Sequence, residues 1–107
     1  MPSLIDDGSF TIMRADLVSR EQFLLAEGVR VEIVIWRLPR RLPGSAHDFK
    51  YRVALIAQGV CVLRYDNEAG KGDHKHIAER EEPYNFVDLD RLLVDFRADV
   101  EAWRAKQ

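Results

Sequence analysis

The clearest hydrophobic pattern in the chain is a C-terminal series of apolar residues at helical spacing. These residues recur at intervals of three and four, which places them on one side of an α-helix. Asp88 suits the N-cap position, and Pro83 keeps the helix from beginning earlier. We therefore predict one long helix over residues 88–105, whose apolar stripe consists of Leu89, Leu92, Leu93, Phe96, Val100 and Trp103.

The segments before this helix show the period-two pattern of β-strands. Residues 29–37 (VRVEIVIWR) are rich in β-branched and aromatic side chains, and alternation puts Val31, Ile33 and Ile35 on one face and Trp36 on the other. Residues 10–17 and 21–25 are weaker strand candidates, and the second segment fits a short helix equally well. Proline and glycine then predict a loop from about residue 38 to residue 48.

Residues 50–57 and 60–66 predict a β-hairpin with its turn at Gln58 and Gly59, where the glycine relieves the tight turn. A two-residue turn pairs Tyr51 with Asp66, Arg52 with Tyr65 and Val53 with Arg64.

Together these elements predict an α+β domain in which an antiparallel sheet of three to five strands packs against one long C-terminal helix. We assign the whole chain, residues 1–107, to one domain. Its parts are N-terminal strands or a short helix in residues 1–28, a sheet core in 29–66, a polar loop in 67–87 and the helix in 88–105.

The composition limits the classes of protein to consider. The chain has 107 residues, of which 47% are hydrophobic and 32% are charged, as in an ordinary soluble domain. The single cysteine, Cys61, excludes an internal disulfide framework and a multi-cysteine zinc site. No apolar run approaches the roughly 20 residues that cross a bilayer, and the acidic N-terminus is unlike a signal peptide. We expect a cytoplasmic protein.

The net charge of −2 conceals a basic middle segment. Residues 37–52 carry Arg37, Arg40, Arg41, Lys50 and Arg52 against Asp48 alone. Such a segment could follow a phosphate backbone, although a solvated face or a partner-binding patch explains it as well. Trp36, Tyr51 and Tyr65 lie nearby in the predicted sheet and could stack on bases, or they could close one end of the core.

Residues 64–76 concentrate the groups that can move protons or hold a phosphate. In an extended segment His74 and His76 lie on one side of the chain, where two imidazoles can divide acid and base duties. The same spacing suits a transition metal with Asp66 or Asp73 as a further ligand, and it also suits two exposed loop histidines. Around Lys71 the two glycines do not form a Walker A motif, since Tyr65 stands at the first glycine position.

Several of these segments resemble the TumE family of small bacterial toxins. The resemblance covers residues 29–105 and rests on the string D-N-E-x-G-K-G-D-H-x-H at residues 66–76, on Phe49–Ala54, on Glu82-Pro83-Tyr84, on the Pro43-Gly44-Ser45 loop and on the C-terminal helix. It implies a cytoplasmic ribonuclease toxin, neutralised by a helix-turn-helix antitoxin that is encoded beside it. It does not imply catalytic roles for individual residues.

We therefore expect an endoribonuclease that cleaves messenger RNA by acid–base chemistry, without a metal or another cofactor. The predicted catalytic residues are His74, His76, Lys71, Arg64, Asp66 and Asp73. The predicted substrate-binding residues are Arg37, Arg41, His47, Lys50, Arg52 and Tyr65. The alternatives are a non-catalytic module that binds a helix-turn-helix partner and a metal-dependent nuclease. A homodimer remains open.

Overall fold

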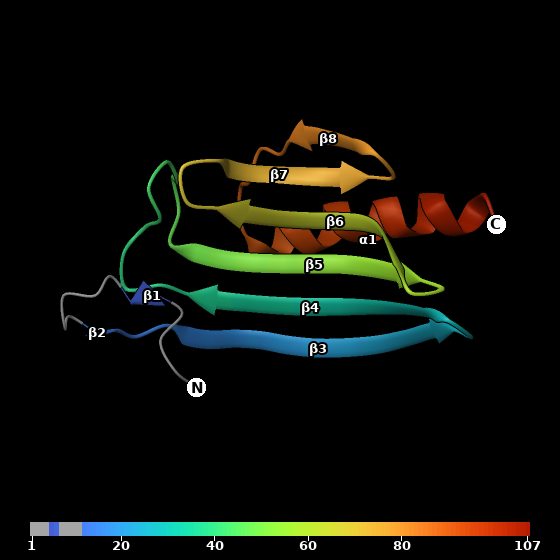
Figure 1. The fold of residues 1–107 in the computed structure, drawn as a ribbon, viewed down its shortest axis with the longest axis horizontal. Helices are drawn as coiled ribbons and strands as arrows, with labels where there is room; N and C mark the ends of the chain where they lie inside the picture. The colour runs from blue at the N-terminus through green and yellow to red at the C-terminus, as the bar shows by residue number, and fades with distance from the viewer. Residues whose placement is uncertain (1–4, 7–11) are drawn as a thin grey trace.

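The computed structural model describes residues 5–6 and 12–107, and its main element is an antiparallel sheet of six strands (Figure 1). The elements are β1 (Ile5–Asp6), β2 (Ile12–Met13), β3 (Asp16–Ala26), β4 (Val29–Arg37), β5 (Phe49–Ala57), β6 (Val60–Glu68), β7 (Gly72–Ile77), β8 (Arg80–Pro83) and α1 (Leu89–Ala105). Strands β3 to β8 are neighbours in chain order, and β1 pairs with β2. The α+β class with one C-terminal helix is confirmed. The predicted count of three to five strands is wrong, because the sheet has six.

The extra strands come from segments whose sequence is too polar to signal a buried strand. Residues 67–87 were predicted to form a loop, but they contain β7 and β8. Strand β7 (GDHKHI) carries polar side chains on both faces and is held by its ladders to β6 and β8. At the other edge, β3 spans the predicted 21–25 segment, so the helical alternative there is also wrong. The part of the predicted 10–17 strand that precedes residue 12 lies outside the described residues.

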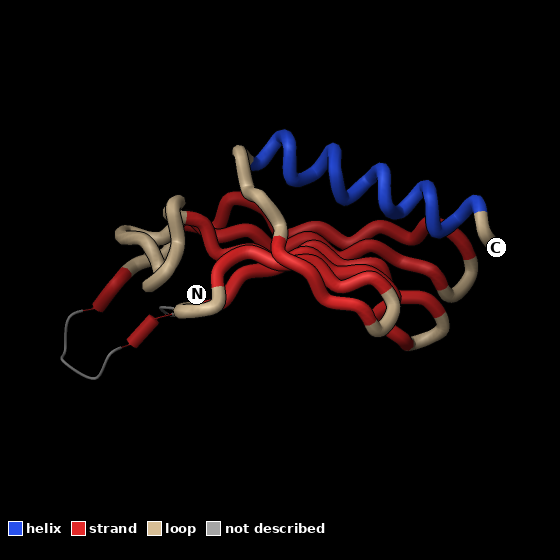
Figure 2. The backbone as a smooth tube through the Cα atoms, turned by 90° about the horizontal axis from the view of Figure 1, so that it is seen from above, coloured by secondary structure: helices blue, strands red, loops and turns tan. Residues whose placement is uncertain are grey.

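Helix α1 covers one face of the sheet, and no described element lies over the other face (Figure 2). Leu92, Phe96 and Val100 are buried against β5 and β6, as the apolar stripe predicts. The helix begins after Asp88, whose side chain accepts a hydrogen bond of 2.7 Å from the backbone N–H of Arg91. We call the uncovered side of the sheet the open face. The described helix is too short and too polar to span a membrane.

The β5–β6 hairpin turns at Gln58 and Gly59 as predicted, both with positive φ, but its register differs by one residue. Leu55 pairs with Leu63 while Ile56 pairs with Cys61, so Val62 is an extra residue in β6. The observed pairs are Arg52 with Asp66, Val53 with Tyr65 and Ala54 with Arg64. This bulge places Tyr65 in the core and Arg64 and Asp66 on the open face.

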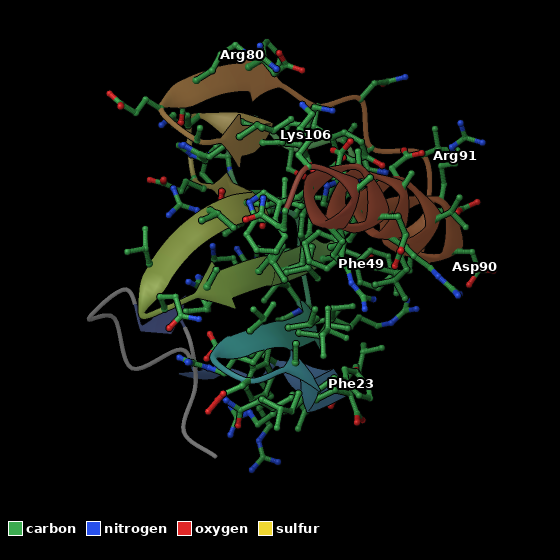
Figure 3. All side chains as sticks on the ribbon, turned by 90° about the vertical axis from the view of Figure 1, so that its right-hand side faces the viewer. Phe23, Phe49, Arg80, Asp90, Arg91 and Lys106 are labelled. Carbon is green, nitrogen blue, oxygen red and sulfur yellow. The ribbon has the colours of Figure 1, made fainter. Side chains whose placement is uncertain are left out.

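The helix leaves part of its own side of the sheet uncovered near β3. An apolar groove of about 460 Å³ runs there between α1 and the β3–β4 edge. Phe23, on the helix side of β3, is 47% exposed at this groove (Figure 3). The groove is on the opposite side of the sheet from the polar residues of the open face.

Candidate functional site

The open face carries a cluster of charged and imidazole side chains from three adjacent strands. Asp66 of β6 pairs with His74 of β7, Arg64 pairs with His76, and His76 pairs in turn with Glu81 of β8. Paired residues project to the same side of a sheet, with Cβ atoms about 5 Å apart. The open-face cluster is therefore built by strand register, and it consists of Arg64, Asp66, His74, His76 and Glu81, with Lys71 at its rim.

The side chains of the cluster are within direct interaction distance of one another. Nε2 of His74 lies 2.8 Å from Oδ1 of Asp66, whose Oδ2 lies 3.0 Å from Nε of Arg64. Nε2 of His76 lies 2.8 Å from Oε2 of Glu81. The two imidazole rings have centroids 5.1 Å apart and are nearly perpendicular to each other. The predicted placement of both histidines on one side of the chain is thus confirmed.

Lys71 reaches the cluster from the turn between β6 and β7. Gly70 and Gly72 have φ values of +78° and +81°, which favour glycine and make this turn tight. Nζ of Lys71 donates a hydrogen bond of 2.9 Å to Oε2 of Glu81. This hydrogen bond raises the pKa of Lys71 and lowers the pKa of Glu81. The backbone N–H of Gly70 donates to the carbonyl of Pro43, which fixes the 38–48 loop against this turn.

The orientation of His74 is fixed through its other ring nitrogen. Nδ1 lies 3.2 Å from the carbonyl oxygen of Gly72, which can only accept, so Nδ1 carries a proton. In the neutral imidazole Nε2 then has a lone pair that faces the cluster. The side chain is only 4% exposed, so His74 is not an exposed loop histidine.

Four buried side-chain atoms lack a hydrogen-bond partner among the described residues, and all four belong to this cluster: Nε of Arg64, Oδ1 of Asp66, Nε2 of His74 and Nε2 of His76. The ion-pair distances are short, but the ring and guanidinium N–H directions do not meet the acceptor oxygens at hydrogen-bonding angles. Buried polar groups are almost always paired, and an unpaired group calls for an explanation such as a catalytic role or a bound ion.

Asp73 lies on the helix side of the sheet, away from the open-face cluster. Its Oδ2 is 2.7 Å from Nε2 of His47 and accepts a hydrogen bond of 2.6 Å from the hydroxyl of Tyr51. His47 also packs on Phe86, with ring centroids 3.9 Å apart. Burial, and next the hydrogen bond to Asp73, raises the pKa of Tyr51. Asp73 was predicted to act with His74 and His76, but its imidazole partner is His47, and neither Asp73 nor His47 faces the open-face cluster.

The other predicted substrate-binding residues are divided between the two faces. Arg52 lies on the open face, paired with Asp66, and its guanidinium is 3.1 Å from Glu32. Lys50 is two residues before Arg52 on β5, so it lies on the same face, and its Nζ donates to the carbonyl of Asn67. Both lie on β5, next to β6, the nearest of the three strands that carry the cluster.

Arg37, Arg41 and Tyr65 do not join them. Arg37 lies on the helix side of β4, where its guanidinium is 4.9 Å from the ring centroid of Phe49. Arg41 is exposed in the 38–48 loop. Tyr65 is 1% exposed in the core and donates to Asp99, so its ring has no face free for a base. Trp36 and Tyr51 are buried too, at 4% and 1% exposure.

Sequence reasoning missed Glu81 and Asn67. Glu81 reaches His76 because β7 and β8 form a hairpin, which the polar sequence does not signal. The amide of Asn67 is buried where β5 and β6 diverge, where it accepts from the N–H of Tyr51 at 3.0 Å and donates to the carbonyl of Phe49 at 2.8 Å. A buried asparagine in a polar sequence gives no periodic signal, so only the structure reveals its role.

The cluster can either exchange protons or hold a metal. Asp66, His74 and His76 offer ligand atoms that all lie within 4.8 Å of one another. Two imidazoles and a carboxylate form a donor set that suits divalent transition metals. Lys71 and Arg64 add positive charge at the rim, where a phosphate could approach from solvent.

Comparison with known families gives a match over almost the whole chain. The family model described as "Toxin TumE" matches residues 3–104. Comparison with curated proteins and with solved structures gave no significant match.

Proposed function

This chain belongs to the TumE family of toxins, and from that premise we propose that it is an endoribonuclease that cuts RNA at its open-face cluster. The observation that supports the site most strongly is the group of four buried, unpartnered polar atoms. Strand register puts their residues on the open face, over which no described element packs (Figure 2). A fold that needed only stability would have paired these atoms or replaced them with apolar groups.

The chemistry we propose is attack of a ribose 2′-oxygen on the adjacent phosphorus. The bond from phosphorus to the 5′-oxygen breaks, and the products are a 2′,3′-cyclic phosphate and a free 5′-hydroxyl. The 2′-hydroxyl gives its proton to a base, and the leaving oxygen receives one from an acid. Extra negative charge develops on the phosphoryl oxygens, so a nearby cation lowers the barrier.

Lys71 and Arg64 are the cations that the cluster presents. The side chain of Lys71 is 48% exposed and that of Arg64 is 30% exposed, so both are within reach of a phosphate in solvent. Arg52 and Lys50 lie on the next strand of the same face and would bind the flanking backbone. In contrast, Nε2 of His74 and of His76 are shielded from solvent. This favours imidazoles that organise the cluster over imidazoles that touch the RNA.

Cleavage of RNA by the purified toxin tests this proposal. We expect cleavage by the wild-type chain and loss of cleavage in a double variant, His74→Ala with His76→Ala. Arg104→Ala is the control, since Arg104 is exposed on α1, across the sheet from the cluster. If the correctly folded double variant cleaves RNA at the wild-type rate, another site does the chemistry.

The membership also implies an antitoxin partner, and we propose that it is a helix-turn-helix protein encoded beside the toxin. Co-expression of the two proteins, followed by purification through a tag on one, should recover a complex in which RNA cleavage is suppressed. A complex that forms while the free toxin cuts no RNA would instead favour a non-catalytic interaction module.

A further inference from the structure

We propose that the open-face cluster binds one divalent transition-metal ion through His74, His76, Asp66 and Glu81. We also propose that this ion is the cation needed for RNA cleavage. The second statement rests on the proposed ribonuclease function, whereas the first does not. The sequence alone favoured metal-free chemistry and kept a metal-dependent nuclease as an alternative. The geometry of the cluster points to that alternative.

Ligand atoms of Asp66, His74 and His76 all lie within 4.8 Å of one another, and Glu81 adjoins the two histidines. Nε2 of His74 is 2.8 Å from Oδ1 of Asp66 and 3.7 Å from Oε2 of Glu81, which is itself 2.8 Å from Nε2 of His76. Metal bonds to nitrogen and oxygen of about 2.1 Å, set at tetrahedral or octahedral angles, separate neighbouring ligands by about 3.0–3.5 Å. The Asp66, His74 and His76 atoms are close enough to share one ion, and a rotation of the exposed Glu81 side chain would add its carboxylate as the fourth ligand.

The directions of the same atoms distinguish a metal site from an ordinary ion pair. An imidazole and a carboxylate that share a proton point at each other, whereas two ligands of one metal both point at a third position. The contact between His74 and Asp66 is short but lacks hydrogen-bond geometry, and so does the contact between His76 and Glu81. A proton on Nε2 of either histidine would therefore be poorly placed to bond its carboxylate, which leaves these nitrogens as candidate metal ligands.

Groups around the ligands supply the support that metal-binding histidines usually have. The Nδ1–H of His74 donates to the carbonyl of Gly72, which leaves the Nε2 lone pair free for a metal. Nζ of Lys71 donates to the Glu81 carboxylate and fixes its orientation, and Nε of Arg64 lies 3.0 Å from the Asp66 carboxylate. The ligands come from three hydrogen-bonded strands, a rigid support for such a site.

The charge of the cluster gives a reason for a metal in a ribonuclease. Three carboxylates lie within 4 Å of Nε2 of His74, those of Asp66, Glu81 and Glu68. Arg64 and Lys71 are the cations paired with them. With neutral histidines three carboxylates outweigh two cations, so Lys71 and Arg64 alone do not make the cluster positive toward an approaching phosphate. A divalent ion reverses this balance and can take a phosphoryl oxygen as a further ligand.

The donor set also indicates the class of metal. Imidazole nitrogen favours Zn²⁺, Co²⁺, Fe²⁺ and similar ions, whereas Mg²⁺ and Ca²⁺ prefer sites made only of oxygen. Two histidines with two carboxylates therefore predict selective binding of a transition metal over Mg²⁺.

The binding test uses Co²⁺ and Zn²⁺ with the full chain after chelator treatment. We expect one Co²⁺ per chain, with visible absorption that Zn²⁺ displaces and a large excess of Mg²⁺ does not. The double variant His74→Ala with His76→Ala should bind at least tenfold more weakly. Glu81→Gln, at an exposed position that leaves the fold intact, should also weaken binding. His47→Gln removes the histidine on the other face and should bind as the wild type does.

Two results would overturn the site. The first is that neither Co²⁺ nor Zn²⁺ binds the wild-type chain at a stoichiometric concentration. The second is that the folded double variant and Glu81→Gln both bind the metal as tightly as the wild type does. The catalytic statement is tested separately with chelated toxin and RNA, where cleavage should stop and return with Zn²⁺, Mn²⁺ or Co²⁺. Full cleavage by the chelated toxin would overturn the catalytic role and leave the binding site. Metal binding without RNA cleavage under any condition would overturn the ribonuclease proposal instead.

Discussion

Asp73 and His47 form a close pair, with Oδ2 of Asp73 2.7 Å from Nε2 of His47, on the side of the sheet that faces α1. The next residue, His74, turns to the open face, where Nε2 lies 2.8 Å from Oδ1 of Asp66. Two neighbouring residues of β7 thus belong to separate sites. Asp73 and His47 connect the 38–48 loop to the sheet, and the open-face cluster lies on the reverse side.

This separation predicts that Asp73→Ala destabilises the fold but leaves metal binding intact. The substitution leaves the hydroxyl of Tyr51 and the ring of His47 without their buried acceptor. We expect a loss of about 2–3 kcal/mol in the free energy of unfolding, measured by urea denaturation. Asp48→Ala, which breaks only the exposed contact to Arg37 at 3.8 Å, is the control and should change stability by less than about 0.5 kcal/mol. Loss of Co²⁺ binding in folded Asp73→Ala would contradict the separation.

Asn67 should be one of the most sensitive polar positions in the protein. Its buried amide takes the place of ladder hydrogen bonds between β5 and β6, satisfying the N–H of Tyr51 and the carbonyl of Phe49. Asn67→Ala orphans both backbone groups and should lower the unfolding free energy by about 2–4 kcal/mol. Asn85→Ala, at an exposed position after β8, should be nearly neutral. Comparable urea midpoints for the two variants would show that the strands pair without the amide.

Sequence patterns predicted the parts of the fold that bury apolar residues at regular spacing. The α1 stripe, strand β4 and the turn at Gln58 and Gly59 all follow from such patterns. The pattern fails where polar side chains line both faces of a strand, as in β7. It also fails at Val62, where one extra residue shifts the β5–β6 register.

The candidate site was predictable in composition but not in arrangement. The concentration of charged groups in residues 64–76 identified His74, His76, Asp66 and Arg64, which register then brings together. Because side chains alternate between the two faces of a strand, Asp73 points away from His74 and His76. The sequence does not reveal that Asp73 contacts His47 or that Glu81 approaches the cluster from β8. Long-range pairing decides both, and a single sequence without homologues does not encode it visibly.

Buried tyrosines predict a loss of stability in alkali. Burial, and next the hydrogen bonds to Asp73 and Asp99, raises the pKa of Tyr51 and of Tyr65. The folded chain therefore keeps both phenolic protons above pH of about 10, where the unfolded chain releases them. The contribution of these two phenols to the free energy of unfolding is fully present below that pH. Above it, the contribution falls by about 1.4 kcal/mol per pH unit for each tyrosine.

Urea denaturation from pH 8 to pH 11.5, with tyrosinate absorbance as a second signal, measures this decline. Tyr65→Phe removes one of these phenols and should make the decline shallower. A stability that stays flat up to pH 11.5 would show that the phenols ionise in the folded state.

Lys71 should matter for RNA cleavage far more than for stability. Its ion pair with Glu81 is exposed, so removal of the side chain should leave the unfolding midpoint unchanged. The same removal takes away a cation at the rim of the open-face cluster and frees the Glu81 carboxylate. We therefore expect Lys71→Ala to lower kcat/KM for a short RNA by about tenfold or more, a loss typical of a charge that acts on the transition state. Arg80→Ala is the matched control, because Arg80 is an exposed cation of β8 that pairs with Glu82 on the helix side. Equal rates for the two variants would mean that positive charge at the rim does not act on the RNA.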